Sequence, residues 1–353
     1  MTRNTITACV AFSIAGLLAP ALFGCGAGQG RTDAVAAPAP IDDDLLALAP
    51  ASPDLVLWAD MAALRRSALW DSLKVLTEDT GGERAHRFAG VDPWQETDQI
   101  LITATHDRKD ELSFLMLIRG RFDAPRLLDS YVRANTGARI ELKGRAGVRT
   151  PEYTAVAVTG RTFAIGPEPL VSEVLSLAGG TGSSLRGSAA FKDLALDGGV
   201  IGRLRFRRGL AAPDLSRYRG QTGGIALERI SGVDASLRAD STVHLSIDVT
   251  TENKLDASGL VREIDRLKRK LKRNALVVFI GVDWLVDRFS AVAEGGAVHV
   301  TFTLDASDLA EVRRLAERIR KVREIAGEDN ADGGLDLDLL PGPLKGAEPG
   351  SSP

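Results

Sequence analysis

The chain has 353 residues, 44% of them hydrophobic and 26% charged, and a formal net charge of −3 at pH 7. Such a chain can bury one large core or two moderate ones, and its near balance of charge excludes a protein drawn as a whole to nucleic acid. Its two cysteines, Cys9 and Cys25, both lie near the amino terminus. The body that follows them therefore contains no disulfide and no thiolate metal cluster.

An apolar segment opens the chain. Arg3 is the only charged residue before Cys25, and residues 6–23 are nearly free of polar side chains. A single basic residue, an apolar run and small residues at its end are typical of a secretory signal. We therefore expect residues 1–24 to be a signal peptide.

The apolar segment ends in Leu22, Phe23, Gly24 and Cys25. These four residues resemble the lipobox of bacterial lipoproteins, in which the cysteine is acylated and becomes the first residue of the mature chain. The resemblance implies fatty acyl chains such as palmitate on Cys25, and hence membrane lipid as a partner. Phe23 departs from the pattern, since a small or β-branched residue is more usual at that position.

Three other interpretations of this segment stay open. The apolar run lies at the lower length limit for an uncleaved membrane span. It could also be an ordinary signal that is cut without lipid attachment, or a wrongly assigned start of the chain. By resemblance to Gram-negative lipoproteins, Gly26 and Ala27 after the cysteine favour transfer to the outer membrane, where we expect the body to face the periplasm.

Two segments without hydrophobic periodicity flank the body. Residues 26–44 combine Gly, Ala and Pro and end in three aspartates. Together with the lipidated cysteine, residues 25–44 are therefore expected to form a flexible tether. Residues 327–353 are rich in Gly, Asp, Pro and Ser, which predicts a disordered acidic tail.

Strand patterns followed by similar helix starts recur in the body. Residues 243–249 and 298–304 both begin with Val-His and alternate apolar with polar residues, as a strand with one buried face does. Each precedes a Leu-Asp-Ala-Ser sequence, and residues 113–118 and 55–60 lead into weaker versions of the same start. The repeated Asp suits a helix N-cap, because its carboxylate accepts the N–H groups of the first turn.

These strand and helix units predict an α+β fold. We expect antiparallel sheets, because hairpin patterns such as 233–249 connect the strands, with amphipathic helices packed on one face. The recurring units also predict two related halves. We place the first α+β domain at residues 45–190 and the second at residues 198–326.

A strand pattern of a different kind surrounds Leu204 and Phe206. Arg203, Arg205 and Arg207 alternate with these two apolar residues. Alternation of this kind is typical of a strand that turns one side to the core and the other to solvent. We therefore predict three solvent-facing arginines without a ligand.

No catalytic motif occurs in the sequence: there is no GxSxG elbow, no Walker loop and no HExxH helix. His244 and His299 occupy the same position in their matching strands, which makes them weak candidates for a shared metal site. The alternative is that they are two solvated imidazoles on a sheet face. We expect neither a cofactor nor, on balance, an enzymatic activity.

Basic residues gather in the helix expected after residue 254, and the candidates for contact with a membrane or another polyanion are Lys268, Arg269, Lys270, Lys272 and Arg273. On an envelope protein, such a face can touch anionic lipid headgroups or acidic cell-wall polymer. The alternative is a solvated helix face, because the apolar stripe of the helix accounts for it without any ligand.

The entry into the body, residues 47–67, resembles that of uncharacterised envelope lipoproteins of Gram-negative bacteria, a resemblance that implies no known activity. We expect a membrane-anchored binding or scaffolding module without enzymatic activity. Its partner would be an unknown envelope protein or a cell-wall component, and not nucleic acid. The alternatives are a periplasmic carrier of hydrophobic ligands and an enzyme whose carboxylates and histidines are dispersed in the sequence.

Overall fold

The computed structural model describes residues 44–70, 93–106, 112–123, 126–129, 132, 137–189, 191, 200–207, 230–274, 277–278 and 281–327. The predicted signal peptide and Cys25 lie outside these residues. So do the predicted tether, apart from Asp44, and the predicted tail, apart from Gly327, which ends α12. The predictions made for them therefore stay predictions.

The described strands come from all parts of the body. They are β1 (Leu55–Asp60), β2 (Thr97–His106), β3 (Leu112–Gly120), β4 (Ala138–Leu142), β5 (Arg145–Arg149), β6 (Thr154–Ala157), β7 (Thr162–Gly166), β8 (Val200–Arg207), β9 (Ile230–Ala239), β10 (Val243–Thr251), β11 (Phe289–Glu294) and β12 (Ala297–Leu304). The helices are α2 (Leu45–Leu48), α3 (Met61–Arg66), α6 (Pro93–Glu96), α8 (Glu168–Ala178), α9 (Lys254–Lys272), α11 (Asp283–Asp287) and α12 (Ala306–Gly327), with a 3-10 turn, η1, at Leu185–Gly187.

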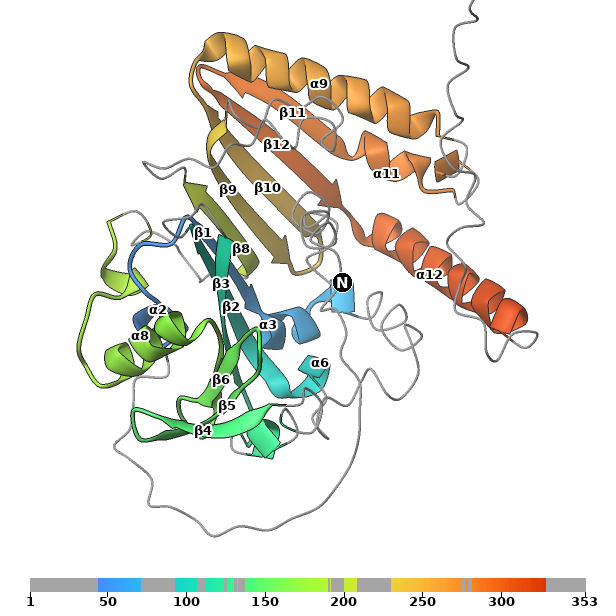
Figure 1. Ribbon diagram of the computed structural model, residues 1–353. Helices are drawn as coiled ribbons and strands as arrows, with labels where there is room; N and C mark the ends of the chain where they lie inside the picture. The colour runs from blue at the N-terminus through green and yellow to red at the C-terminus, as the bar shows by residue number, and fades with distance from the viewer. Residues whose placement is uncertain are drawn as a thin grey trace, which may run out of the picture.

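All these strands form one sheet (Figure 1). It has twelve strands in the order β11-β12-β10-β9-β8-β1-β2-β3-β7-β6-β5-β4, and every neighbouring pair is antiparallel. The predicted antiparallel α+β fold is therefore confirmed. The strands of the two predicted domains meet where β1 pairs with β8, so that a single sheet runs through both.

The strand order repeats outward from this central pair. On one side it runs β1-β2-β3-β7-β6, and on the other it runs β8-β9-β10-β12-β11. The third strand of each series is followed by a helix that precedes the next strands, namely helical residues 126–129 and α9. The hairpin β4–β5 extends the first series only. This symmetric order agrees with the two predicted halves, whose common origin stays a prediction.

One face of the sheet is apolar from the edge strand β11 to β5, the strand next to the opposite edge. A row of directly paired residues on this face begins at β11 and ends at β5: Ala291, Val300, Ile247, Ala235, Leu204, Leu57, Ile102, Met116, Ile165, Ala155 and Val148. Helix α9 packs on this face in the second half through Ala257, Leu260 and Ile264. Leu127 and Leu128 cover it in the first half. We call it the Leu57 face.

The opposite face changes character at the centre of the sheet. Its corresponding row is Ser290, Thr301, Ser246, Ser236, Arg203, Trp58, Leu101, Leu117, Ala164 and Val156. Trp58 and the residues after it lie in a buried cluster with Val171, Val174 and Leu175 of α8 and with the leucines of α2. We call this side the Trp58 face. The prediction of helices on one face was therefore wrong, since α8 and α9 lie on opposite faces of the sheet.

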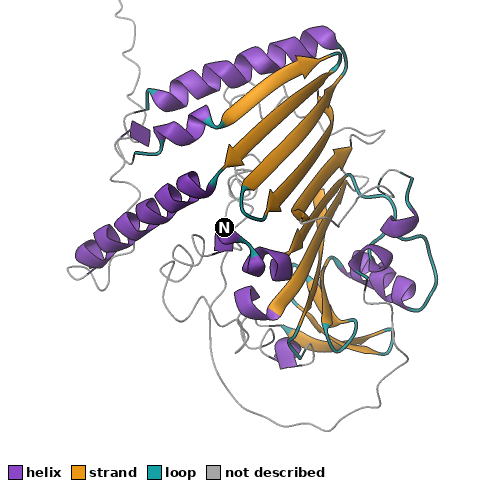
Figure 2. Ribbon diagram, turned by 180° about the vertical axis from the view of Figure 1, so that it is seen from behind, coloured by secondary structure: helices purple, strands orange, loops and turns teal. Residues whose placement is uncertain are grey.

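The helices that end the two halves take different directions. Helix α8 follows β7 and returns over the Trp58 face. Helix α12 follows β12, and its first turns join a cluster on the Leu57 face through Leu309 and Val312. Beyond these turns α12 runs away from the sheet, as both overall views show (Figures 1 and 2). In the second half, the Trp58 face therefore has no counterpart of α8 within the described part of the chain.

Helix starts follow the predicted capping pattern with one change. Asp60 accepts a hydrogen bond from the backbone N–H of Ala63 at 2.6 Å, and Asp305 accepts those of Ser307 and Asp308 at 2.8 and 3.0 Å. Helix α9 instead uses Asn253, which accepts the N–H groups of Leu255 and Asp256 at 2.9 and 3.0 Å. The helix therefore begins at Lys254, before the aspartate that the sequence suggested as its cap.

Candidate binding surfaces

Helix α9 forms the outer layer beside the last strands of the second half (Figure 1). Its first turns are held against the sheet, because Ala257 is fully buried and Leu260, Val261 and Ile264 pack on the strands. The same stripe then continues past this cluster. Leu267 and Leu271 lie on it one and two turns further along and are 37% and 38% exposed.

The predicted basic residues of α9 divide into two groups. Lys268 and Lys272 turn toward the body: the Lys268 Nζ donates to the backbone carbonyl of Phe289 at 2.5 Å, and the Lys272 Nζ donates to both carboxylate oxygens of Asp287 at 2.7 and 2.8 Å. The hydrogen bond from Lys272 holds the pKa of Asp287 below its ordinary value. These two lysines fasten the helix end to β11 and α11.

The other group points away from the sheet. At about 100° per residue, an α-helix places positions 262, 266, 269, 270 and 273 on the side opposite the stripe that faces the strands. We call the exposed residues at these positions the basic ridge: Arg262, Arg266, Arg269, Lys270 and Arg273. Among them, Arg266 has an ion pair with Glu263 at 2.9 Å. The structure thus brings three predicted residues, 269, 270 and 273, together with two that the prediction omitted.

An exposed leucine lies on the same side of α9 as the basic ridge. Leu255, in the first turn, is 82% exposed, the largest exposed fraction among the large apolar residues that stand out on the described surface. Helix geometry places it in line with Arg262 and Arg273. The outer side of α9 therefore combines one large apolar side chain with a row of cations, a combination also found in helices that bind at membrane surfaces.

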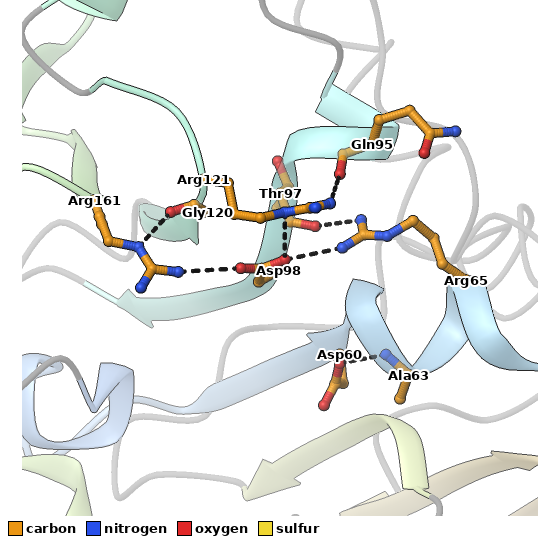
Figure 3. A network of polar contacts seen from close by, with 9 residues as sticks. All are labelled: Asp60, Ala63, Arg65, Gln95, Thr97, Asp98, Gly120, Arg121 and Arg161. Carbon is orange, nitrogen blue, oxygen red and sulfur yellow. Dashed lines mark hydrogen bonds and ion pairs between the residues drawn. The ribbon is translucent and has the colours of Figure 1, made fainter.

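A cluster of arginines around Asp98 joins several elements of the first half (Figure 3). Arg65 of α3 donates to Asp98 Oδ1 at 2.9 Å and to the carbonyl of Thr97 at 2.6 Å. Arg121 approaches the same oxygen at 3.5 Å, and Arg161 donates to Asp98 Oδ2 at 3.3 Å. Because Asp98 is only 19% exposed, its charge stabilises these three cations and ties α3 to the ends of β2, β3 and β7.

A second cluster with the same composition surrounds Asp234 on the Trp58 face. Arg205 donates to Asp234 Oδ2 through Nε at 2.7 Å and approaches it through Nη2 at 2.6 Å. Arg203 and Arg207 approach the same carboxylate at 3.7 and 3.5 Å. The side chain of Arg205 is only 6% exposed, so the prediction of a solvent-facing arginine there was wrong. The alternating pattern identified the strand but carried no sign of the carboxylate on the neighbouring strand.

The two candidate metal-binding histidines lie on the polar part of the Trp58 face, on neighbouring strands. His244 pairs with Thr303 and contacts its hydroxyl at 3.0 Å, while His299 pairs with Asp248, whose carboxylate lies 2.5 Å from the imidazole Nδ1. Four residues along each strand separate the two positions, roughly 13 Å. The imidazoles therefore do not meet, and within the described residues no three His, Cys, Asp or Glu side chains are grouped to hold a metal ion.

In the part of the chain that the structure describes, no helix combines enough length with enough apolar character to cross a bilayer. The candidate surfaces are the basic ridge of α9 and the polar region of the Trp58 face.

No protein-family model matches the chain, and no curated protein matches it. Among solved structures, the chain is similar to crystal form III of TP0453, with a TM-score of 0.45 and 12% identity over 76% of this chain and 96% of that one. Crystal forms I and IV of TP0453 give TM-scores of 0.42 and 0.43, identities of 12% and 11%, and coverages of 77% and 80% of this chain and 97% of the other. TM-scores below 0.5 assign no function to this chain.

Proposed function

We propose that the protein is a non-enzymatic binding or scaffolding module of the bacterial envelope, held to the outer membrane by acyl chains on Cys25 and facing the periplasm. The observation that supports a binding role is the polar region of the Trp58 face. In the first half this face is buried beneath α2 and α8. In the second half this face carries Arg, Asp, His, Ser and Thr side chains. Helix α12 does not cover it, because the first turns of α12 pack on the Leu57 face.

This polar region offers groups that a polar partner can bind. Asp248 and His299 are 52% and 44% exposed and already contact each other, and Thr250 and Thr303 are exposed at the two ends of the same strand pair. Charges of both signs and hydroxyl groups lie side by side. Protein interfaces with a polar rim use such groups for hydrogen bonds across the contact, and we therefore expect an envelope protein or a cell-wall component as the partner.

The anchor is tested with the substitution Cys25→Ala. The wild-type protein should incorporate radiolabelled palmitate in its host and fractionate with membranes, while the variant should incorporate none. If the wild-type chain takes up no palmitate, the lipid-anchored function is excluded. This experiment tests the anchor independently of any partner.

The binding surface is tested by site-specific photo-crosslinking in cells. A crosslinking amino acid placed at Thr303 or Thr250 should give a discrete adduct with one envelope component. The same group at Ser183, an exposed residue beside the first half, serves as the matched control and should give none. Equal adducts at all three positions, or none at the two test positions, would contradict a binding role for the polar region.

The two alternative functions, a carrier of hydrophobic ligands and an enzyme, predict different properties of the purified protein. A carrier of hydrophobic ligands should co-purify with lipid, which mass spectrometry detects. An enzyme would depend on the Asp248–His299 pair, because these are the carboxylate and histidine that the structure brings into contact on an exposed surface. Activity against envelope polymers that is lost in His299→Gln would favour that alternative over a scaffold.

A further inference from the structure

The basic ridge of α9 is a surface that the proposed binding role leaves unused. We propose that the ridge docks the body onto a bilayer containing anionic phospholipid, so that acylated Cys25 and α9 form two separate contacts with one membrane. This inference rests on the lipid anchor of the proposed function. It adds an orientation, because a body held at two points presents one side to the bilayer and another to the periplasm.

Orientation of the charged side chains is the first argument. The sheet side of α9 is occupied by Ala257, Leu260 and Ile264, and the two lysines nearest the body are bound to Phe289 and Asp287. The five cations of the basic ridge are exposed on the outer side of the helix. They are therefore available to a flat surface that approaches the helix along its length.

Charge is the second argument. The chain as a whole has a net charge of −3, so a row of exposed cations on one helix face is a local concentration and not a general property of the surface. Glu263 offsets Arg266 at 2.9 Å, and the other acidic residues of the helix are Asp256, which is bonded to the Asn253 amide at 2.8 Å, and the half-buried Asp265. Each Lys or Arg near an anionic leaflet raises the affinity roughly five-fold.

An exposed leucine supplies the third argument. Leu255 lies in line with the ridge and is 82% exposed. Interfacial helices combine basic residues with large apolar side chains that enter the headgroup region. Acidic cell-wall polymer would satisfy the cations but would leave Leu255 in water, and for this reason we favour a phospholipid surface.

The test uses the full lipidated protein in vesicles. The mature chain has no cysteine other than Cys25, which carries the lipid, so that Ser258→Cys on α9 introduces one thiol for a fluorescent donor. Ser183→Cys in the first half gives the matched donor position. Energy transfer to an acceptor on the lipid headgroups is compared between vesicles of phosphatidylcholine alone and vesicles that also contain phosphatidylglycerol.

We expect transfer from position 258 to rise at least two-fold in the anionic vesicles and to fall again at high salt, because screening weakens contacts between exposed charges. The double substitution Arg269→Gln and Lys270→Gln should abolish the rise. The control Arg313→Gln and Arg314→Gln removes two cations of similar exposure from α12 and should leave it unchanged. Thermal unfolding identical to that of the parent protein shows that each variant is folded.

Two outcomes would overturn the docking proposal: equal transfer from position 258 in neutral and anionic vesicles, or an undiminished rise in the ridge variant. Failure of the lipid anchor gives a different result. In that case the protein does not sediment with neutral vesicles at all, whichever ridge residues are present. The amount bound therefore reports on the anchor, and the energy transfer reports on α9.

Discussion

The two halves of the sheet share a strand order but differ in what their Trp58 faces carry. Across the central pair, Trp58 of β1 lies directly opposite Arg203 of β8. From that point the row is apolar through Leu101 and Leu117 and polar through Ser236 and Ser246. The Leu57 face shows no such change. Within the described residues, helices therefore cover both faces of the first half and only the Leu57 face of the second half.

This difference accounts for the directions of the terminal helices. Helix α8 returns over its own half because Val171, Val174 and Leu175 find apolar partners there, and burying each such side chain contributes roughly 1.5–3 kcal/mol. A return of α12 would place its apolar stripe against arginines and aspartates. Desolvating those groups without partners is unfavourable, and α12 instead uses its first turns on the Leu57 face.

The largest expected effect comes from corresponding strands of the two halves. Leu117 on β3 is 1% exposed, while Ser246 on β10 lies half-buried on the same face. Leu117→Ala should lower the free energy of unfolding by about 2–5 kcal/mol through a lost contact and a cavity. Ser246→Ala should change it by less than about 0.5 kcal/mol. Denaturant unfolding measures both, and equal losses would contradict the assignment of a covered and an uncovered face.

The arginine clusters provide the next comparison. Asp98→Ala removes the carboxylate that holds Arg65, Arg121 and Arg161. The Arg65 side chain is only 12% exposed, and leaving its charge without the carboxylate should cost about 1–3 kcal/mol of stability. Asp234→Ala should cost a similar amount, because its cluster has the same composition. Asp129→Ala, which breaks an ion pair with Arg139 that is 67% exposed, is the control. A loss as large in the control would show that burial of the clusters has no role.

Helix caps should not distinguish the halves. Asp60→Ala in the first half and Asn253→Ala in the second each leave N–H groups of a first helical turn without an acceptor. Both should lower the free energy of unfolding by about 1 kcal/mol, as other N-cap substitutions do. Asp60→Asn and Asn253→Asp keep the acceptor and should restore most of the loss. An effect confined to one half would limit this local rule to one region of the molecule.

The smallest effect concerns the end of α9 and depends on pH. The hydrogen bond that Lys272 donates lowers the pKa of Asp287 below its ordinary value. A carboxyl group with a lowered pKa in the folded state stabilises that state above its unfolded pKa, and loses this contribution as the pH falls through the folded value. The difference in unfolding free energy between wild type and Asp287→Asn should be constant near neutral pH and shrink below about pH 4. If the difference in unfolding free energy grew as the pH fell, the pKa of Asp287 could not be lowered in the folded state.

Much of the local structure could be predicted from the sequence. Alternation identified β10 and β12, and the aspartates before α3 and α12 do cap those helices, because period-two patterning and first-turn hydrogen bonds depend on residues close in the chain. The similar sequences of residues 243–249 and 298–304 do not mark corresponding strands of the two halves. These strands are neighbours in one half, whereas the topological counterpart of β10 is β3.

What the sequence did not reveal depends on pairing between distant segments. No sequence pattern singled out Asp98 or Asp234, because the arginines around Asp98 come from α3 and from the residues before β7 as well as from the end of β3. Likewise, the five basic residues predicted on α9 could not be divided into inward and outward groups before Phe289 and Asp287 were placed beside them. Arg262 and Arg266 joined the ridge only through the helix geometry.

The position of β1 at the middle of the sheet bears on the order in which the chain emerges. Leu55 is among the first residues of the body to be made, yet its partner Phe206 follows only after about 150 further residues. Until β8 arrives, one side of β1 presents unpaired N–H and C=O groups, which are a template for pairing with other chains. Strand β8 of the second half thus protects this edge of β1 from pairing with another molecule. A chain truncated before β8 would leave the edge of β1 exposed and prone to intermolecular pairing.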